Sequence, residues 1–224
     1  MNETHEKRTT QPFGTFFNLI YTVALLISRL LHPVSVKGLE NLPRNGALLI
    51  ANHSSNWDPI LLATALPRDY RLRVMAKEEL FHYPVLGWIL KRVGAFPVSR
   101  GNNDIQSVKT AIQAIKAGDN LLIFPEGTVI RNGIGCADGL PAHAKGGVAM
   151  IGVRTGAIMV PVFVDGEKRL FHKTRIIFGK PYQPVYTGRH GTAEEMQKIA
   201  DDILEAAYAL GGQAVGGAPL CQEP

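Results

Sequence analysis

The fold of this chain is decided by the stretch Ala47-Leu48-Leu49-Ile50-Ala51-Asn52-His53-Ser54-Ser55-Asn56-Trp57-Asp58-Pro59. It begins with a short continuous apolar run, which is typical of a buried strand. A polar segment follows, and the apolar run at residues 60–66 then predicts a helix that Pro67 ends. A buried strand that leads through a polar loop into a helix indicates an α/β sheet, in which sites gather at strand ends.

His53 and Asp58 have four residues between them and follow that strand directly. An aspartate that accepts one ring N–H of an imidazole fixes its tautomer and leaves the other nitrogen free to take a proton from a hydroxyl. No serine or cysteine nucleophile is needed, because the hydroxyl can belong to the substrate. The alternative interpretation is a helix-starting loop in which His53 is a solvated cap.

The rest of the chain alternates short strands with helices, which predicts an α/β domain with helices packed on a mixed sheet. Further strands are expected at residues 34–38, 71–76, 95–98, 120–124, 158–164 and 175–178. Further helices are expected at residues 84–93, after Asp104, at residues 143–154, and after a capping box at residues 192–195. The glycine-rich segment 127–141 predicts a loop.

The N-terminal residues 9–28 carry no charged side chain, and about 20 apolar residues are enough to span a bilayer. Three interpretations stay open: a helix lying in one leaflet, a spanning helix, and a soluble helix that covers the core. We expect a tail and membrane-associated helix at residues 1–33, a catalytic domain at 34–210 and a disordered tail at 211–224. The expected location is the membrane, with the domain facing the cytoplasm.

Length, composition and net charge limit the number of domains and the kinds of partner that we expect. The chain has 224 residues, of which 46% are hydrophobic, so one domain with a full core is expected. The net charge of +5 favours phosphate substrates or anionic lipid surfaces. Nucleic acid is the weakest candidate partner, because Lys and Arg form no long run with interleaved aromatic residues. The two cysteines lie far apart and make neither a disulfide framework nor a metal site, which indicates a reducing compartment. The seven histidines are scattered without the spacing of metal ligands, so we expect no metal. We also expect no cofactor.

Two further fragments place polar groups at the ends of expected strands. Glu126 follows one buried strand, and Gly127 beside it lets the backbone approach a ligand closely. Arg100 follows a short strand, where a guanidinium can hold a phosphate through two parallel N–H bonds. Taken alone, Glu126 would be interpreted as an exposed residue in a strand-to-loop turn. Arg100 alone would be interpreted as a surface arginine in contact with solvent.

Together, residues 52–59 and 124–128 resemble the glycerolipid acyltransferase family, which comprises the 1-acyl-sn-glycerol-3-phosphate (lysophosphatidic acid) acyltransferases and their relatives. The resemblance runs from about Val36 to about Pro184 and includes residues 38–43, 76–80 and 160–162. The combination of Asn-His-x4-Asp with Phe-Pro-Glu-Gly-Thr about seventy residues later is specific, whereas either piece alone is weak.

The resemblance implies that His53 is the general base and that Asp58 orients it. It implies a donor that is a fatty acyl thioester on coenzyme A or acyl carrier protein, used as co-substrate, and an enzyme associated with membrane lipid. Such a mechanism needs no acyl-enzyme, because His53 activates the acceptor hydroxyl directly. The thiolate that leaves is a good leaving group, since a thiol has a pKa of about 8.5.

The resemblance also implies an acceptor site for glycerol phosphate, formed by the region of Arg100 and by Glu126, Gly127 and Thr128. Lys145, which precedes two glycines, resembles a basic-glycine element of the family. It is either a phosphate contact or an ordinary residue of a helix N-terminal turn.

The sequence departs from the family pattern at two positions near the expected phosphate. Val129 stands where an arginine commonly follows the Glu-Gly-Thr turn, and Arg131 lies two residues on as a substitute. Ser99 stands where an acidic residue often precedes the arginine at position 100. Both changes leave the acyl-transfer chemistry intact and weaken the assignment of the acceptor.

We therefore expect a membrane-associated acyltransferase that acylates the sn-2 hydroxyl of 1-acylglycerol-3-phosphate and produces phosphatidic acid. One alternative keeps the chemistry and uses another lysophospholipid or lipid acceptor. Two others are a non-catalytic lipid-binding relative and a thioester hydrolase.

Overall fold

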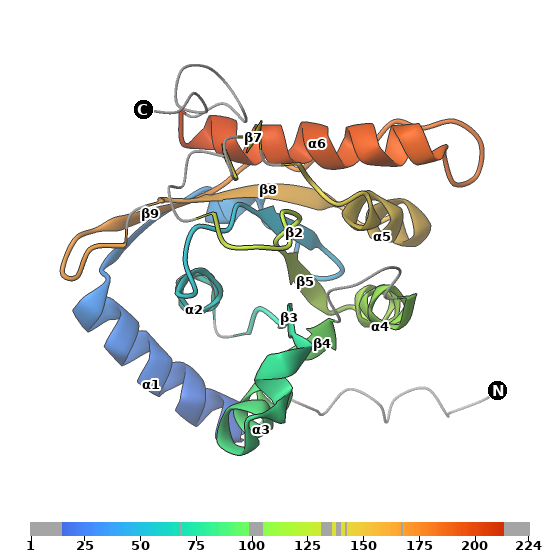
Figure 1. Ribbon diagram of the computed structural model, residues 1–224. Helices are drawn as coiled ribbons and strands as arrows, with labels where there is room; N and C mark the ends of the chain where they lie inside the picture. Colours follow the sequence, from blue (N-terminus) through green and yellow to red (C-terminus); the bar gives the residue numbers. More distant parts are fainter. Residues whose placement is uncertain are drawn as a thin grey trace.

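The computed structural model describes residues 15–67, 69–98, 105–130, 136–137, 140–141, 143–166 and 168–212 (Figure 1). Its helices are α1 (Thr15–Leu31), α2 (Asp58–Ala65), α3 (Pro84–Arg92), α4 (Ile105–Lys116), α5 (Gly147–Thr155) and α6 (Ala193–Leu210). Its strands are β1 (Val34–Lys37), β2 (Leu48–Ala51), β3 (Leu72–Lys77), β4 (Phe96–Val98), β5 (Asn120–Ile123), β6 (Cys136–Ala137), β7 (Leu140–Pro141), β8 (Met159–Val164) and β9 (Thr174–Phe178). Two short 3₁₀ helices cover Leu39–Asn41 and Glu78–His82.

Seven strands form a mixed sheet in the order β1-β9-β8-β2-β5-β3-β4. Strands β8, β2, β5, β3 and β4 run parallel to one another, whereas β9 is antiparallel to β8 and parallel to β1. In the centre, Leu48 of β2 lies opposite Leu121 of β5 and Met159 of β8. The carboxyl ends of β2, β5 and β8 therefore meet at one edge of the sheet. The predicted α/β class, with helices flanking a mixed sheet, is confirmed.

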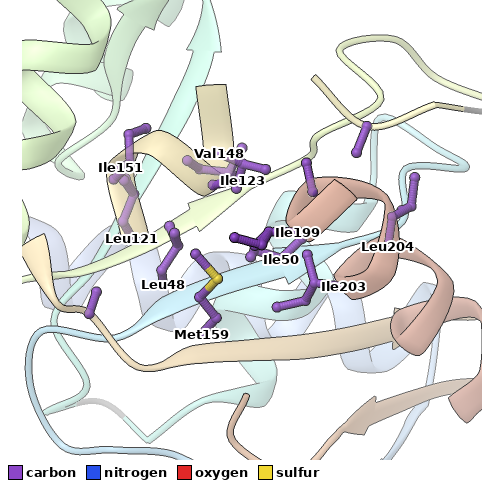
Figure 2. Close-up of a cluster of buried hydrophobic side chains, with 14 of the residues drawn as sticks. Leu48, Ile50, Leu121, Ile123, Val148, Ile151, Met159, Ile199, Ile203 and Leu204 are labelled. Carbon is purple, nitrogen blue, oxygen red and sulfur yellow. The ribbon is translucent and has the colours of Figure 1, made fainter. Parts of the chain in front are cut away.

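Helices cover both faces of this sheet, as Figure 1 shows: α4, α5 and α6 lie on one face, and α2 lies on the other with α1 outside it. This arrangement explains why β2 is apolar at every position. Leu48 and Ile50 pack in the cluster under α5 and α6, which is drawn in Figure 2. Leu49 and Ala51 pack in the opposite cluster, with the side chains of α2.

Most expected elements lie within a few residues of their predicted places, including α6 with its capping box at Thr192 and Glu195. One helix begins later than expected. The helix predicted at residues 143–154 begins at Gly147, because Lys145 N donates to Pro125 O at 2.9 Å and so holds residues 143–146 against the end of β5. The loop predicted at residues 127–141 contains the two-residue strands β6 and β7, which pair with each other. Asp104 and residues 1–14 and 213–224 lie outside the described residues.

Helix α1 is attached to α2 through polar contacts. Tyr21 Oη donates to Leu66 O at 2.9 Å, and Ser28 Oγ donates to Thr64 Oγ1 at 3.2 Å. The opposite side of α1 exposes five large apolar side chains, namely Leu19, Val23, Leu26, Ile27 and Leu30. Within the described ranges, no helix combines the length and the apolar character needed to cross a membrane.

Candidate active site

The loop that carries His53 leaves the sheet at a fixed point because Asn52 binds the end of the neighbouring strand. Asn52 is fully buried. Its Nδ2 donates to Val164 O at 2.9 Å, and its Oδ1 accepts from Val164 N at 2.8 Å. The carboxamide thus takes the place of a backbone pair between β2 and β8, and satisfies two buried backbone groups.

His53 and Asp58 are in contact, as the sequence predicts for a base and its orienting group. His53 Nδ1 lies 3.1 Å from Asp58 Oδ2, and the imidazole stacks on Phe124 with ring centroids 4.1 Å apart. The side chain of Asp58 is fully buried, whereas that of His53 is 13% exposed. With Nδ1 bonded to the carboxylate, Nε2 is the nitrogen that can accept a proton from a substrate.

The carboxylate of Asp58 also organises its own loop. Its Oδ2 accepts hydrogen bonds from Ser54 N at 2.7 Å and Ser55 N at 2.8 Å. Asp58 is the first residue of α2, where a negative charge interacts favourably with the helix dipole. Its second oxygen, Oδ1, lies 3.0 Å from Nζ of Lys168, a lysine whose side chain is only 5% exposed.

Sequence reasoning missed Lys168, although a signal was present. Residues 165–169 form a charged segment directly after the buried strand β8. Because β8 is the parallel neighbour of β2, a polar group that follows β8 lies at the same edge of the sheet as His53.

Glu126 contacts the backbone of His53, whereas Asp58 contacts its ring. Its Oε2 accepts from His53 N at 2.7 Å, and its Oε1 accepts from the hydroxyl of Tyr208 on α6. Burial raises the pKa of Glu126 to about 7, and the hydrogen bonds from Tyr208 and His53 oppose this rise in part. Both carboxylate oxygens therefore have donors within the protein, and Glu126 fixes the position of His53. Tyr208 carries no local signal, since it lies on the apolar face of a helix.

Three other predicted site residues lie together at the end of β5. Gly127 has a φ of +69°, and a Cβ placed there would lie 2.8 Å from Nζ of Lys145. Glycine at this position therefore lets the lysine side chain cross the turn. Thr128 and Lys145 are both exposed. Arg100 and Arg131, the other two predicted contacts of the acceptor, lie outside the described residues, as does Ser99.

A hollow of about 570 Å³ lies beside the loop that joins His53 to Asp58. It is lined by Ser54, Ser55, Asn56, Trp57, Val129, Gly166, Lys168 and Arg169. Ile130 N donates to His53 O at 2.7 Å, which brings the segment after β5 against the histidine loop. In the described part of the chain, no three His, Cys, Asp or Glu side chains group as metal ligands would.

This arrangement supplies the elements of general base catalysis at an edge of the sheet. A buried carboxylate orients a partly exposed imidazole, and a hollow with basic side chains in its wall lies next to it. Nucleophilic catalysis by the protein is not needed, because a substrate hydroxyl can give its proton to His53.

Comparison with known proteins identifies the family of this chain. The family model described as Acyltransferase matches residues 33–165, which is more than half of the chain. The chain is 34% identical over 153 residues to the 1-acyl-sn-glycerol-3-phosphate acyltransferase of Bacillus subtilis, a match that covers 66% of this chain and 73% of that protein. It is 33% identical over 141 residues to the enzyme of the same name from Streptococcus pneumoniae, and this match covers 60% of this chain and 49% of that protein.

A solved structure shares the fold. The crystal structure of the 1-acyl-sn-glycerophosphate (LPA) acyltransferase PlsC from Thermotoga maritima superposes with a TM-score of 0.54 at 22% identity, covering 87% of this chain and 79% of that one. At this identity the likeness concerns the fold, and the family assignment rests on the sequence matches. The chain belongs to the acyltransferase family that includes the 1-acyl-sn-glycerol-3-phosphate acyltransferases.

Proposed function

We propose that this protein transfers a fatty acyl group from an acyl thioester to the sn-2 hydroxyl of 1-acylglycerol-3-phosphate, giving phosphatidic acid. The observation that carries the proposal is the contact of 3.1 Å between His53 Nδ1 and the buried carboxylate of Asp58, beside a hollow. The names of the relatives support the choice of substrate.

In the proposed reaction, Nε2 of His53 takes the proton of the acceptor hydroxyl while the hydroxyl oxygen attacks the thioester carbonyl. The tetrahedral intermediate collapses, the C–S bond breaks, and the imidazolium returns the proton to the leaving thiolate. Asp58 stabilises the imidazolium between these two steps. The protein forms no covalent intermediate and requires no cofactor, and the donor is acyl-CoA or acyl-ACP.

The experiment is acyl transfer by the purified full-length protein in lipid vesicles, with each donor paired with 1-acylglycerol-3-phosphate. Loss of the base should lower kcat in His53→Ala by at least about a thousandfold. His190→Ala, which removes an exposed histidine before α6, is the matched control. Undiminished transfer by His53→Ala would exclude the proposed base. Thiol release that does not depend on added lysolipid would instead indicate a thioester hydrolase.

The acceptor phosphate is proposed to bind beside the turn of Glu126, Gly127 and Thr128, where Lys145 supplies a positive charge. Arg100 and Arg131 are proposed as additional contacts. A second candidate keeps the same chemistry with another lysophospholipid or lipid acceptor. Val129 favours this candidate, because an apolar residue in the wall of the hollow stands where an arginine is common in the family. A panel of lysolipids that differ in headgroup separates the two, because the first candidate requires a clear preference for the phosphate monoester.

Membrane association is proposed to occur through the exposed face of α1. The five exposed apolar residues of α1 lie on the side that does not contact α2, as in helices that lie in one leaflet. Phe171 N donates to Leu31 O at 2.7 Å, so the exposed Leu170 and Phe171 continue this surface beyond the end of α1. This placement would bring the lysolipid to the domain from the membrane, with the domain on the cytoplasmic side.

The membrane proposal is tested by flotation of the protein with vesicles that contain anionic phospholipid. The double variant Leu26→Ser, Leu30→Ser should bind these vesicles less than the natural protein. Val185→Ser, which removes a 90% exposed apolar side chain before α6, should bind them equally well. Equal flotation of all three proteins would contradict the role of α1.

A further inference from the structure

Lys168 is a buried lysine whose ammonium group faces the carboxylate that orients the catalytic base. Its Nζ lies 3.0 Å from Asp58 Oδ1 and donates to Ser54 Oγ at 3.0 Å. It also donates to the carbonyl of Asp165, in the segment that follows β8. The lysine side chain is 5% exposed and the aspartate side chain is fully buried. The contact therefore joins the end of β8 to the histidine loop, across more than a hundred residues of sequence.

The two oxygens of Asp58 have separate partners. Oδ2 is surrounded by His53 Nδ1, Ser54 N and Ser55 N at 3.1, 2.7 and 2.8 Å. In the described part of the chain, Lys168 is the one cation that contacts Oδ1. Rotation about the last bond of an aspartate side chain is soft, because this torsion has broad energy wells. The ammonium group of Lys168 is held in place by Ser54 and Asp165, and its attraction for Oδ1 opposes that rotation, which keeps Oδ2 on the imidazole.

The charge of Lys168 has a second consequence. A buried carboxylate without a cation is strongly unfavourable, and so is a buried ammonium group without an anion. Replacing a buried ion pair by apolar side chains is often neutral for stability. The pair is therefore poorly explained by stability alone, and its position next to the proposed base suggests a role in the reaction.

We infer that Lys168 is a positioning residue, which fixes the Asp58 carboxylate and thereby the His53 imidazole, so that the base is held by a Lys168–Asp58–His53 chain. The inference rests on the proposed acyl transfer and adds to it a residue outside the Asn-His-x4-Asp segment. Lys168 also lines the hollow beside the dyad, together with Val129 and Trp57. The cation that orients the base thus forms part of the wall that a bound substrate would meet.

The test compares kcat and KM of Lys168→Met with those of the natural protein, using the full chain in lipid vesicles. Lys168 contacts the orienting carboxylate and not the histidine itself, and loss of such an outer partner lowers activity by about ten- to a hundredfold. This loss should appear in kcat with little change in KM. Lys173→Met, which removes an exposed lysine of the same segment, is the matched control and should have unchanged kinetics. If the natural protein itself transfers no acyl group, the proposed function fails rather than this inference.

Two further variants separate positioning from a defect in folding. In an Asp58→Asn background, Lys168→Met should cause no further loss of kcat, because Lys168 acts through the charge of Asp58. Lys168→Cys should have low activity that 2-bromoethylamine restores, since the reagent rebuilds an ammonium side chain on the cysteine. The natural protein treated in the same way controls for its own two cysteines. A kcat of Lys168→Met equal to that of the natural protein would overturn the inference, as would equal losses from Lys168→Met in both backgrounds.

Discussion

Two buried carboxylates hold His53, and they do so in different ways. Asp58 contacts the imidazole ring, and its Oδ2 takes hydrogen bonds from groups three to five residues away. Glu126 contacts the backbone N–H of His53, and its partners lie 73 and 82 residues away along the chain. The ring is therefore oriented mainly by a local segment, whereas the position of the loop on the sheet depends on tertiary structure. Substitutions at the two carboxylates should consequently have different effects.

The largest expected effect is on the rate, from Asp58→Asn. An amide in this place can hold the wrong tautomer of the imidazole and does not stabilise the imidazolium, so kcat should fall by about a thousand- to ten-thousandfold. Steady-state acyl transfer measures this loss. Asp202→Asn, at a more exposed aspartate that pairs with Lys198 on α6, is the control. Retention of most activity in Asp58→Asn would show that the local contact does not orient the base.

The next largest effect is expected from Glu126→Gln, on how the free energy of unfolding depends on pH. Burial raises the pKa of Glu126 from 4.5 to about 7. Between these pH values the folded protein keeps a proton that the unfolded chain releases, so this group's contribution to the free energy of unfolding falls as pH rises. The loss amounts to about 3 kcal/mol when the pH has passed through 7.

Denaturant unfolding of Glu126→Gln at pH 5 and pH 8 tests this. Glutamine does not titrate, so the variant should lose less stability between the two pH values than the natural protein loses. Glu205→Gln, at an exposed position of α6, should behave like the natural protein. An identical pH dependence for Glu126→Gln and the natural protein would contradict the raised pKa of Glu126.

The smallest effect is expected from Tyr208→Phe, which removes a donor to Glu126 and leaves the aromatic ring in the core. The free energy of unfolding should fall by about 1 kcal/mol. The hydrogen bond from Tyr208 lowers the pKa of Glu126, so its removal should raise that pKa further. Unfolding curves recorded from pH 5 to pH 9 should then place the pH-dependent loss of stability at higher pH than in the natural protein. A loss at the same pH would mean that Tyr208 does not influence Glu126.

The same contrast explains how much the sequence could predict. The buried strand β2, the His53–Asp58 contact and the Thr192 capping box depend on neighbours within a few residues, and pattern reasoning found them. Lys168 was missed because its contact with Asp58 depends on the pairing of β2 with β8.

Tertiary contacts also account for the other differences. Glu126 was expected to face the substrate, and its contacts with Tyr208 and His53 depend on where α6 packs. The late start of α5 has a similar cause, since Lys145 N bonds to Pro125 O, far away in sequence. The expected contacts of Arg100 and Arg131 with a phosphate stay predictions.

The two hydrogen bonds between the Asn52 side chain and the backbone of Val164 limit how this site can evolve. Because a side chain completes the pairing of two strands, inserting or deleting one residue in β2 or β8 would separate Asn52 from Val164 and turn alternate side chains to the wrong face. Segments beyond the strand ends are not bound by this restriction. If the proposed function holds, related enzymes can differ in acceptor through substitutions at positions such as 129, while the strands that carry the proposed base keep their length.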